Sequence, residues 1–153
     1  MSTPAPFGRM LTAMVTPFKK DGSIDWDGVE KIADHLVKTG HDGIVVNGTT
    51  GEAPTTKSSE KEEIIKVVKR VVGANIKVVS GAGDNETDYS INQAKRSEAA
   101  GADGILVVTP YYNKPPQAGI KAHFLAMANA TGLPMMLYDI PGRTGVEIES
   151  DTI

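Results

Sequence analysis

The sequence lacks cysteine, a cluster of basic residues and any long apolar run, and each absence excludes a class of protein. Without cysteine, the 153-residue chain has no disulfide framework, no cysteine-ligated metal centre and no cysteine nucleophile. A formal net charge of −3 supplies no surface for nucleic-acid phosphates. The longest apolar runs are strand-sized, far short of the ~20 residues of a membrane span. Residues 1–10 show no secretory signal. We expect a cytoplasmic protein with no nucleic-acid or membrane partner.

Short β-branched runs alternate along the chain with longer amphipathic segments. The five runs begin 28 to 33 residues apart, close to the ~30 residues of a strand–helix–strand unit. They are apolar on both faces, as in parallel strands that are covered by helices. The strand candidates are Leu11–Val15, Gly43–Val46, Ile76–Ser80, Gly104–Val108 and Pro134–Tyr138.

Each interval between the strand candidates carries the signals of a helix. Apolar residues recur at helical spacing between Val29 and Val37, and a glycine follows each helical segment. Ser59 and Glu62 form the pattern of a capping box at the start of the second helix. The third and fourth helices are expected over Thr87–Ala100 and Gln117–Ala130, and residues 149–151 resemble the start of a fifth.

Two architectures share this alternating pattern. One is a doubly wound parallel sheet of five strands, and the other is a portion of a (β/α)₈ barrel. The periodicity does not distinguish them. The chain shows no linker, no low-complexity segment and no second domain, so the pattern indicates a single α/β domain.

Ligands bind at the carboxyl ends of the strands in parallel α/β folds, and three strand ends here carry polar side chains. Thr49 and Thr50, between glycines after the second strand, suit a carboxylate or phosphate, or form an ordinary turn. Tyr111 and Tyr112 follow the fourth strand, where a tyrosine either carries a proton or packs in the loop. Arg143, after the fifth strand, suits a carboxylate or is solvated.

In combination, the strand ends resemble those of the pyruvate-dependent Schiff-base lyases, the family that includes dihydrodipicolinate synthase and N-acetylneuraminate lyase. The resemblance runs from about Gly8 to Ile153 and favours the barrel. It implies an α/β fold, the N-terminal portion of a (β/α)₈ TIM barrel with about five strands and four helices. The matching segments are Val15-Thr16-Pro17-Phe18, Gly48-Thr49-Thr50-Gly51-Glu52, Val108-Thr109-Pro110-Tyr111-Tyr112 and Tyr138-Asp139-Ile140-Pro141-Gly142-Arg143-Thr144-Gly145.

The resemblance implies roles for five residues. Members of the family hold pyruvate as an imine on a barrel lysine and condense it with aspartate semialdehyde in lysine biosynthesis. Thr49, Tyr112 and Tyr138 match the hydroxyl relay that moves protons, and the tyrosine matching Tyr112 crosses a subunit interface. Thr50 matches the residue that holds the pyruvate carboxylate, and Arg143 matches the residue that binds the carboxylate of the second substrate. The expected partners are these two substrates and further copies of the chain, as in the family's homotetramers, with no cofactor.

The imine-forming lysine of the family lies on a sixth strand, which this chain does not reach before Ile153. Lys77 opens the third strand at the wrong end of a barrel, and Lys61 is expected to be a solvated residue of the second helix. An imine-forming amine needs a desolvated pocket, and none of the lysines present is well placed for one. Lys114, in a loop, is the least implausible substitute. We therefore expect residues 1–153 to be an incomplete barrel domain that stops before the sixth strand.

Other interpretations stay open beside the synthase. One makes the chain part of another pyruvate or 2-oxo-acid aldolase such as N-acetylneuraminate lyase, against which Arg143 argues. Another makes it a non-catalytic half-barrel that only assembles, or a flavodoxin-like domain. Residues 16–19 lack the acidic cluster or phosphate loop that a flavodoxin-like domain needs. The three histidines, His35, His41 and His123, share no ligand spacing, so no metal site is expected.

Overall fold

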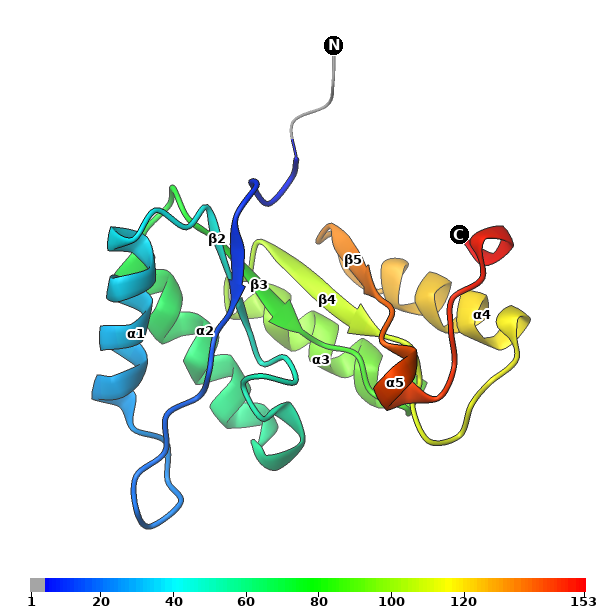
Figure 1. The fold of residues 1–153 in the computed structure, drawn as a ribbon, viewed down its shortest axis with the longest axis horizontal. Coiled ribbons are helices and arrows are strands. Elements are labelled where there is room, and N and C mark those ends of the chain that lie inside the picture. Colours follow the sequence, from blue (N-terminus) through cyan, green and yellow to red (C-terminus); the bar gives the residue numbers. More distant parts are fainter. Residues whose placement is uncertain (1–4) are drawn as a thin grey trace.

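The computed structural model describes residues 5–153, in which strands and helices alternate as the sequence pattern predicts (Figure 1). The strands are β1 (Leu11–Ala13), β2 (Gly43–Val46), β3 (Lys77–Gly81), β4 (Gly104–Val108) and β5 (Met135–Tyr138). The long helices are α1 (Trp26–Lys38), α2 (Ser58–Val72), α3 (Thr87–Ala99) and α4 (Gln117–Ala128). Three short helical turns complete the chain: η1 (Ala53–Thr55), α5 (Pro141–Thr144) and η2 (Ser150–Thr152). Among the described helices, none combines the length and apolar character that crossing a membrane requires.

The order of the strands decides between the two candidate architectures. All five strands are parallel and lie in the order β1-β2-β3-β4-β5, so that each strand pairs with the next one along the chain. A doubly wound sheet reverses its strand order at a switch point, and no such reversal occurs here. A sheet whose strands follow one another in sequence, each joined to the next by a helix, is the arrangement of a (β/α) barrel.

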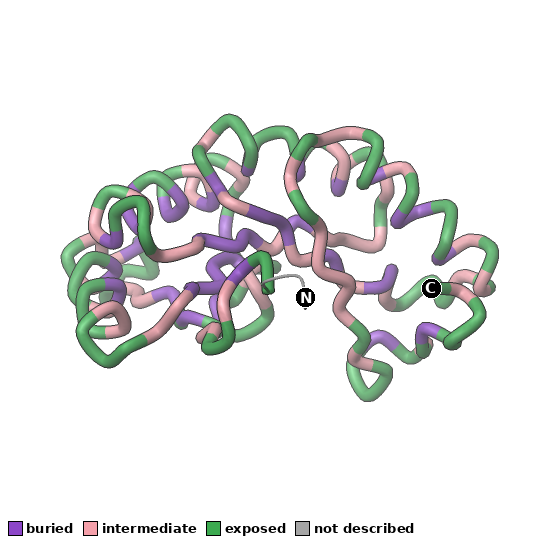
Figure 2. The backbone as a smooth tube through the Cα atoms, turned by 90° about the horizontal axis from the view of Figure 1, so that it is seen from above, coloured by how far each residue is buried: buried purple, intermediate pink, exposed green. Residues whose placement is uncertain are grey.

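The helices form one layer against one face of the sheet. Consecutive long helices pack on each other, α1 on α2, α2 on α3 and α3 on α4, and the ribbon shows them following the curve of the strands (Figure 1). The buried residues gather between helices and strands, whereas the outer faces of the helices are exposed (Figure 2). This single helical layer is what a barrel wall requires.

Alternating side chains of the strands divide the core into an outer and an inner part. Ile44 and Val78 pack toward α1 and α2, and Ile105 packs toward α3 and α4. The residues next to them, Val45 and Val79, point to the other face, where they pack with Phe7. Leu11, Leu106 and Met136, partly buried, join this inner cluster. The inner cluster corresponds to the interior of a barrel wall.

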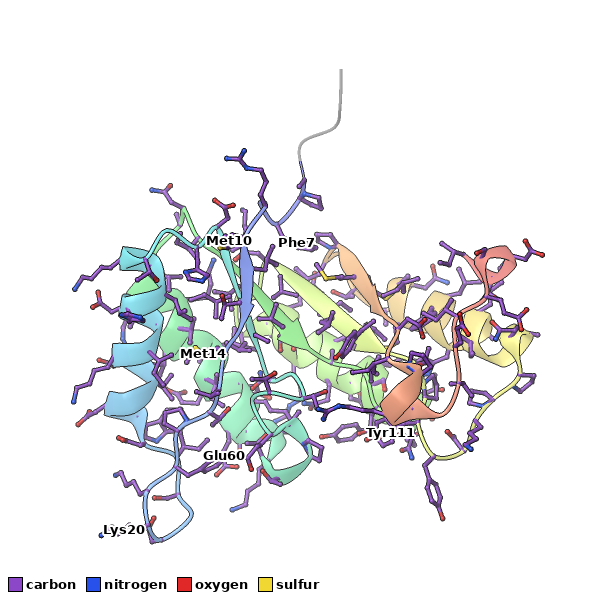
Figure 3. The ribbon with its side chains drawn as sticks, in the orientation of Figure 1. Phe7, Met10, Met14, Lys20, Glu60 and Tyr111 are labelled. Atoms are coloured by element: carbon purple, nitrogen blue, oxygen red, sulfur yellow. The ribbon has the colours of Figure 1, made fainter. Side chains whose placement is uncertain are left out.

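Two glycines let the backbone approach closely at opposite ends of the sheet. A Cβ atom on Gly104 would lie 2.3 Å from the Phe7 ring, which covers the amino end of the strands. A Cβ atom on Gly81 would lie 2.0 Å from the carbonyl oxygen of Asn47, where β2 and β3 end. Phe7 and Tyr111 lie at opposite ends of the sheet (Figure 3). The amino end is therefore filled by an aromatic side chain, and polar side chains occupy the carboxyl end.

Two details of the expected helices are wrong. The second helix begins at Ser58, so Ser59 and Glu62 lie inside it rather than forming its capping box. Glu60 takes that role, because its carboxylate accepts a hydrogen bond of 2.7 Å from the backbone N–H of Lys57. Near the end of the chain, the helical signal at residues 149–151 produces only the 3₁₀ turn Ser150–Thr152. Both differences concern helix ends, where several polar residues compete for the same backbone groups.

Candidate active site

A cavity of about 280 Å³ opens at the carboxyl ends of the strands. Its wall is built from the segments that follow β2, β3, β4 and β5, together with residues of α2 and α3. Because consecutive strands are parallel, these segments meet at one end of the sheet although they are far apart in the sequence. The polar side chains that matter most for the chemistry are Asn47, Thr49, Lys61, Asp84, Tyr138 and Arg143.

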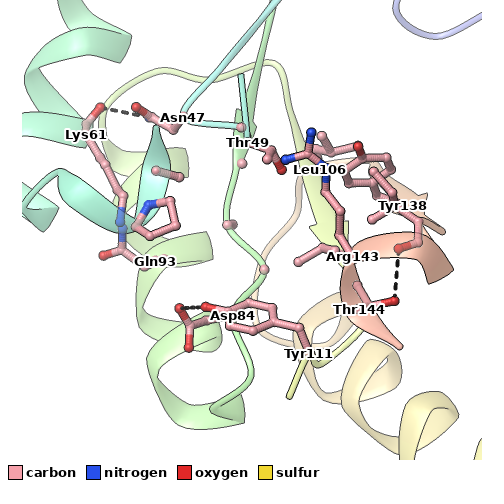
Figure 4. A pocket seen from close by; sticks show the side chains of 18 of the residues that line it. Asn47, Thr49, Lys61, Asp84, Gln93, Leu106, Tyr111, Tyr138, Arg143 and Thr144 are labelled. Carbon is pink, nitrogen blue, oxygen red and sulfur yellow. Dashed lines mark hydrogen bonds between the residues drawn. The ribbon is translucent and has the colours of Figure 1, made fainter. Parts of the chain in front are cut away.

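The structure brings three of the five expected site residues together. Thr49, Tyr138 and Arg143 all line the cavity. Figure 4 shows the Arg143 side chain extending from α5 toward Thr49 and Tyr138. No hydrogen bond joins the hydroxyls of Thr49 and Tyr138 to each other in the part of the chain that the structure describes. The two hydroxyls and the guanidinium therefore line the same cavity, and the two hydroxyls are not hydrogen-bonded to each other.

The other two expected site residues lie outside the cavity. Thr50 is exposed and is not part of the cavity wall. Tyr112 is 89% exposed and also lies outside the wall, although its neighbour Tyr111 is part of it. The Tyr112 backbone has φ of +72°, a conformation that non-glycine residues adopt only at a cost in free energy. The three hydroxyls expected to form the proton relay, those of Thr49, Tyr112 and Tyr138, therefore do not lie in one cavity within the described chain.

The turn that carries Thr49 is anchored by buried hydrogen bonds. Asn47, 3% exposed, takes a positive φ of +56° and donates from Nδ2 to the carbonyl of Lys61 and the hydroxyl of Ser80, both at 3.1 Å. Thr16, from the segment after β1, donates from its hydroxyl to the carbonyl of Gly51 at 2.7 Å. These contacts tie the turn to α2, β3 and the first strand segment, so that Thr49 sits on a rigid support.

Arg143 lies on α5, a single helical turn where the sequence alone indicates only a Pro-Gly turn. Pro141 opens the turn, and Gly145 ends it with φ of +74°. The Thr144 hydroxyl is buried 2.8 Å from the carbonyl oxygen of Val146, which fixes the far end. The guanidinium of Arg143 has no carboxylate within 4.0 Å among residues 5–153. It is therefore available to an anionic ligand in the cavity.

The segment after β3 contributes a residue that the sequence analysis overlooked. The Asp84 carboxylate accepts a hydrogen bond of 3.0 Å from the Tyr111 hydroxyl (Figure 4). Burial of Tyr111, with this hydrogen bond and the negative charge of Asp84, raises the pKa of Tyr111 to about 12. Tyr111 therefore stays protonated at neutral pH and acts as a donor. The strand-end argument used for the other segments also applies to residues 81–85 and was the available signal.

Lys61 is buried, and the expectation that it is solvated is wrong. The residue is 9% exposed and lines the cavity, with Nζ 3.3 Å from the Tyr89 hydroxyl and 5.7 Å from the centre of the Tyr89 ring. Its place in α2 explains the burial, since it lies three and four residues before the buried Ile64 and Ile65. That spacing puts Lys61 on the apolar face of the helix and could have been read from the sequence.

The described residues include no group of three or more histidine, aspartate and glutamate side chains arranged to hold a metal ion. Of the histidines, His123 is the buried one near the site, on α4 with 4% exposure. Its Nδ1 lies 3.0 Å from the Thr87 hydroxyl. The polar groups that line the cavity are hydroxyls, amides, the cations of Lys61 and Arg143, and the Asp84 carboxylate, which accepts from Tyr111. The guanidinium of Arg143, unpaired among the described residues, and the hydroxyls suit a small oxygen-rich organic anion.

Taken with the strand order, this placement defines the class of protein as a (β/α) barrel with its ligand cavity at the carboxyl ends of the strands. The model of the dihydrodipicolinate synthetase family matches residues 6–153. The chain belongs to that family, as the resemblance predicted.

Relatives and solved structures agree with the family match. The chain is 59% identical to a 4-hydroxy-tetrahydrodipicolinate synthase of Acidothermus cellulolyticus over 98% of this chain and 49% of that protein. It is 56% identical to a second such synthase, from Streptomyces coelicolor, over 99% of this chain and 51% of that protein. A crystal structure of the enzyme from Cyanidioschyzon merolae with lysine bound has a TM-score of 0.93 and 52% identity, over 96% of this chain and 50% of that one.

The chain spans about half the length of these relatives. Its five strands and their helices match the N-terminal portion of the (β/α)₈ barrel, which confirms the predicted fold class.

Proposed function

We propose that the chain is the N-terminal part of a 4-hydroxy-tetrahydrodipicolinate synthase. Such an enzyme is a lyase of the aldolase type that condenses pyruvate with L-aspartate 4-semialdehyde through a lysine Schiff base, in the diaminopimelate route to lysine. The observation that carries the proposal is the convergence of Thr49, Tyr138 and Arg143 on one cavity, in a chain 59% identical to a relative of that name. The cytoplasm is the proposed location, because both substrates are small charged metabolites.

The hydroxyl groups are proposed to move protons. Thr49, in the turn after β2, and Tyr138, at the end of β5, line the cavity, and a chain of hydroxyls can pass protons without a buried charge. Tyr112 is the third proposed member of the relay. Its 89% exposure and its absence from the cavity of its own chain support delivery into a second copy. The assembly is therefore proposed to be a homo-oligomer, namely a homotetramer.

Two residues are proposed to bind the carboxylates of the substrates. Arg143 has a guanidinium at the cavity that no carboxylate of residues 5–153 pairs with, and it is suited to bidentate binding of the aspartate semialdehyde carboxylate. Thr50 is proposed to hold the pyruvate carboxylate together with neighbouring backbone N–H groups. Because Thr50 lies outside the wall of the described cavity, this role requires the remaining strands to extend the wall around it.

The imine-forming lysine is proposed to come from a sixth strand outside residues 1–153, which then form an incomplete barrel domain. Five strands leave β1 and β5 each paired on one side in the described chain, and a barrel of eight needs three more. Lys61 is the best-placed lysine of residues 5–153, but its ammonium is engaged with Tyr89. Lys114 is exposed in a loop and does not line the cavity.

The proposal is tested by trapping the imine. The 153-residue chain, and the same chain completed with the C-terminal half of the Acidothermus cellulolyticus relative, are treated with pyruvate and borohydride. Intact mass and peptide mapping then locate the adduct. Circular dichroism first confirms that each protein is folded, and omission of pyruvate is the control. We expect an adduct on the completed barrel alone, at a lysine of the added half, and turnover with aspartate semialdehyde.

Two other outcomes would count against this assignment. An adduct on the 153-residue chain, mapped to Lys61 or Lys114, would show that the chain carries its own imine-forming amine. A completed barrel that is folded and forms no adduct would remove pyruvate-imine chemistry, and with it the proposed reaction. Other aldehydes offered with pyruvate separate the synthase from related pyruvate aldolases.

A further inference from the structure

The turn after β4 is held to the segment after β3 on both sides of Tyr112. On one side, the Tyr111 hydroxyl donates to Oδ2 of Asp84 at 3.0 Å. On the other side, Nδ2 of Asn113 donates to the carbonyl of Asn85 at 3.1 Å. Both contacts join residues more than 25 positions apart in the sequence, so they are tertiary contacts and not part of the turn itself.

Asp84 is itself fixed by contacts with α3. Its backbone N–H donates to the hydroxyl of Ser90, which is fully buried, at 2.9 Å. Its other carboxylate oxygen, Oδ1, accepts from the backbone N–H of Glu86 at 3.3 Å. The carboxylate that receives the Tyr111 hydroxyl is therefore oriented by the start of a long helix and does not hang from a free loop.

Tyr112 is the residue that this arrangement controls. Its φ of +72° is unfavourable for a side chain with a Cβ atom, and Lys114 in the same turn has φ of +45°. An exposed turn with two such residues would relax unless surrounding contacts held it. The Asp84–Tyr111 and Asn85–Asn113 contacts supply that constraint, and as a result Tyr112 projects 89% exposed from the surface.

We infer that Asp84 is a positioning residue, which holds Tyr111 and so presents Tyr112 in the orientation that a second copy of the chain receives in its active site. The inference rests on the proposed function, in which Tyr112 carries protons in a neighbouring copy. Asp84 acts through Tyr111 and exerts its effect on the proton-transfer step, while the binding of pyruvate is left to other residues. Preorganisation of this kind lowers the free-energy cost of assembling the shared site.

The test compares variants of the completed barrel. Asp84→Ala removes the acceptor, Tyr111→Phe removes the donor, and the double variant removes both. Asp84→Asn keeps an oxygen that can accept from Tyr111 and is the conservative variant. Asp88→Ala is the matched control, since it removes an exposed carboxylate from the same helix start whose side chain makes no hydrogen bond among residues 5–153.

We expect Asp84→Ala to lower kcat about 10-fold, the size of losing one hydrogen bond to a charged acceptor, with KM for pyruvate and the borohydride adduct unchanged. Tyr111→Phe is expected to have a similar effect, and the double variant no larger one, because both changes break the same contact. Asp84→Asn and Asp88→Ala are expected to stay within about 3-fold of the parent. Additive losses in the double variant, an unchanged kcat in Asp84→Ala, or equal losses in Asp84→Asn and Asp84→Ala would overturn the inference.

A second measurement does not depend on catalysis. Hydrogen exchange of the peptide covering residues 109–116 of the 153-residue chain reports on the turn, where the Asn113 amide donates to the Tyr111 carbonyl at 2.9 Å. We expect exchange about 10-fold faster than in the parent chain for Asp84→Ala, and an unchanged exchange rate for Asp88→Ala. Unchanged exchange in Asp84→Ala would overturn the inference even if turnover fell. If the completed parent forms no pyruvate adduct, the proposed function fails, and the exchange result alone decides whether Asp84 holds the turn.

Discussion

Lys61 is a buried cation whose partner is an aromatic hydroxyl instead of a carboxylate. No salt bridge to it occurs in the described part of the chain, and its Nζ contacts Tyr89, which lines the same cavity from α3. A charge removed from water without an opposite charge is costly, and apolar replacements of similar shape are often neutral or stabilising. We therefore expect that the ammonium group of Lys61 does not stabilise the folded chain.

We expect Lys61→Met to raise the free energy of unfolding of the chain by about 1 kcal/mol, because the desolvation cost disappears while the packing volume stays. Tyr89→Phe is expected to lower it by about 1 kcal/mol, since Lys61 then loses its acceptor. Urea unfolding followed by circular dichroism measures both. Lys66→Met, an exposed position of the same helix, is the control. A loss of stability in Lys61→Met would show that the ammonium is a net stabilising group.

His123 couples the stability of the α3–α4 pair to pH. The ring is 4% exposed beside Phe124, with Nδ1 bonded to Thr87 and Nε2 without a partner among the described residues. Burial lowers the pKa of His123 below its usual 6.5, and the negative charges of Asp84 and Glu86 oppose that shift only in part. The unfolded chain therefore binds this proton more readily than the folded chain does.

Between the lowered pKa and 6.5, protonation favours the unfolded state, so stability falls as the pH decreases through this window. We expect the free energy of unfolding to decrease as the pH falls through 6.5, and His123→Gln to remove part of this slope. His35→Gln, at an exposed histidine, serves as the comparison. An identical slope in His123→Gln and the parent protein would exclude His123 as its source.

Among the secondary-structure elements, the contact between the ends of β2 and β3 has the least room. Gly81 ends β3 where its Cα faces the carbonyl of Asn47, and a Cβ atom there would lie 2.0 Å from the oxygen and 2.7 Å from the carbon. Both are backbone atoms, so no side chain can rotate away. The glycine lets the two strand ends approach closely enough to form the wall of the cavity.

We expect Gly81→Ala to destabilise the chain by about 3 kcal/mol, the upper range for overpacking, because β2 and β3 must separate. Gly142→Ala is the matched control: a Cβ atom there meets nothing within 4 Å. Its helical turn should be unchanged or slightly stabilised, by up to about 1 kcal/mol. Thermal unfolding by circular dichroism compares the two variants. Equal midpoints would mean that the strand ends yield more easily than their geometry indicates.

At the scale of the whole molecule, the sheet ends in two strands that are each paired on one side. In residues 5–153, β1 pairs with β2 alone and β5 with β4 alone. On the inner face of the sheet, the apolar side chains of Leu106 and Met136 are only partly buried. Unpaired strand edges beside apolar side chains are templates for association, and closing a barrel removes them.

We therefore expect the 153-residue chain alone to self-associate, with an average mass that rises with concentration. The barrel completed with the C-terminal half of the Acidothermus cellulolyticus relative should show one defined oligomer, because its edges are paired. Size-exclusion chromatography with light scattering distinguishes the two. A 153-residue chain that remains monomeric at all concentrations would show that its edges are already protected.

The strand-end argument located much of the site from the sequence, and its failures have physical causes. It identified Thr49, Tyr138 and Arg143, which share the cavity, because parallel strands bring their carboxyl ends together whatever the intervening helices are. It did not identify Asp84, whose importance depends on a hydrogen bond to Tyr111 from another segment. It also treated Lys61 as solvated by its residue type, although the helical spacing to Ile64 and Ile65 places it inside.

The strands, the helices and their periodicity could be predicted from the amino-acid sequence, since they follow from local patterns of apolar residues, glycines and capping groups. It also carried the family resemblance, because the strand-end segments stand in a fixed order. The fold was needed to show that the sheet runs β1 to β5 without reversal and that Tyr112 is exposed outside the cavity of its own chain. The reason is that strand order and side-chain direction depend on contacts between distant segments, which the local pattern does not specify.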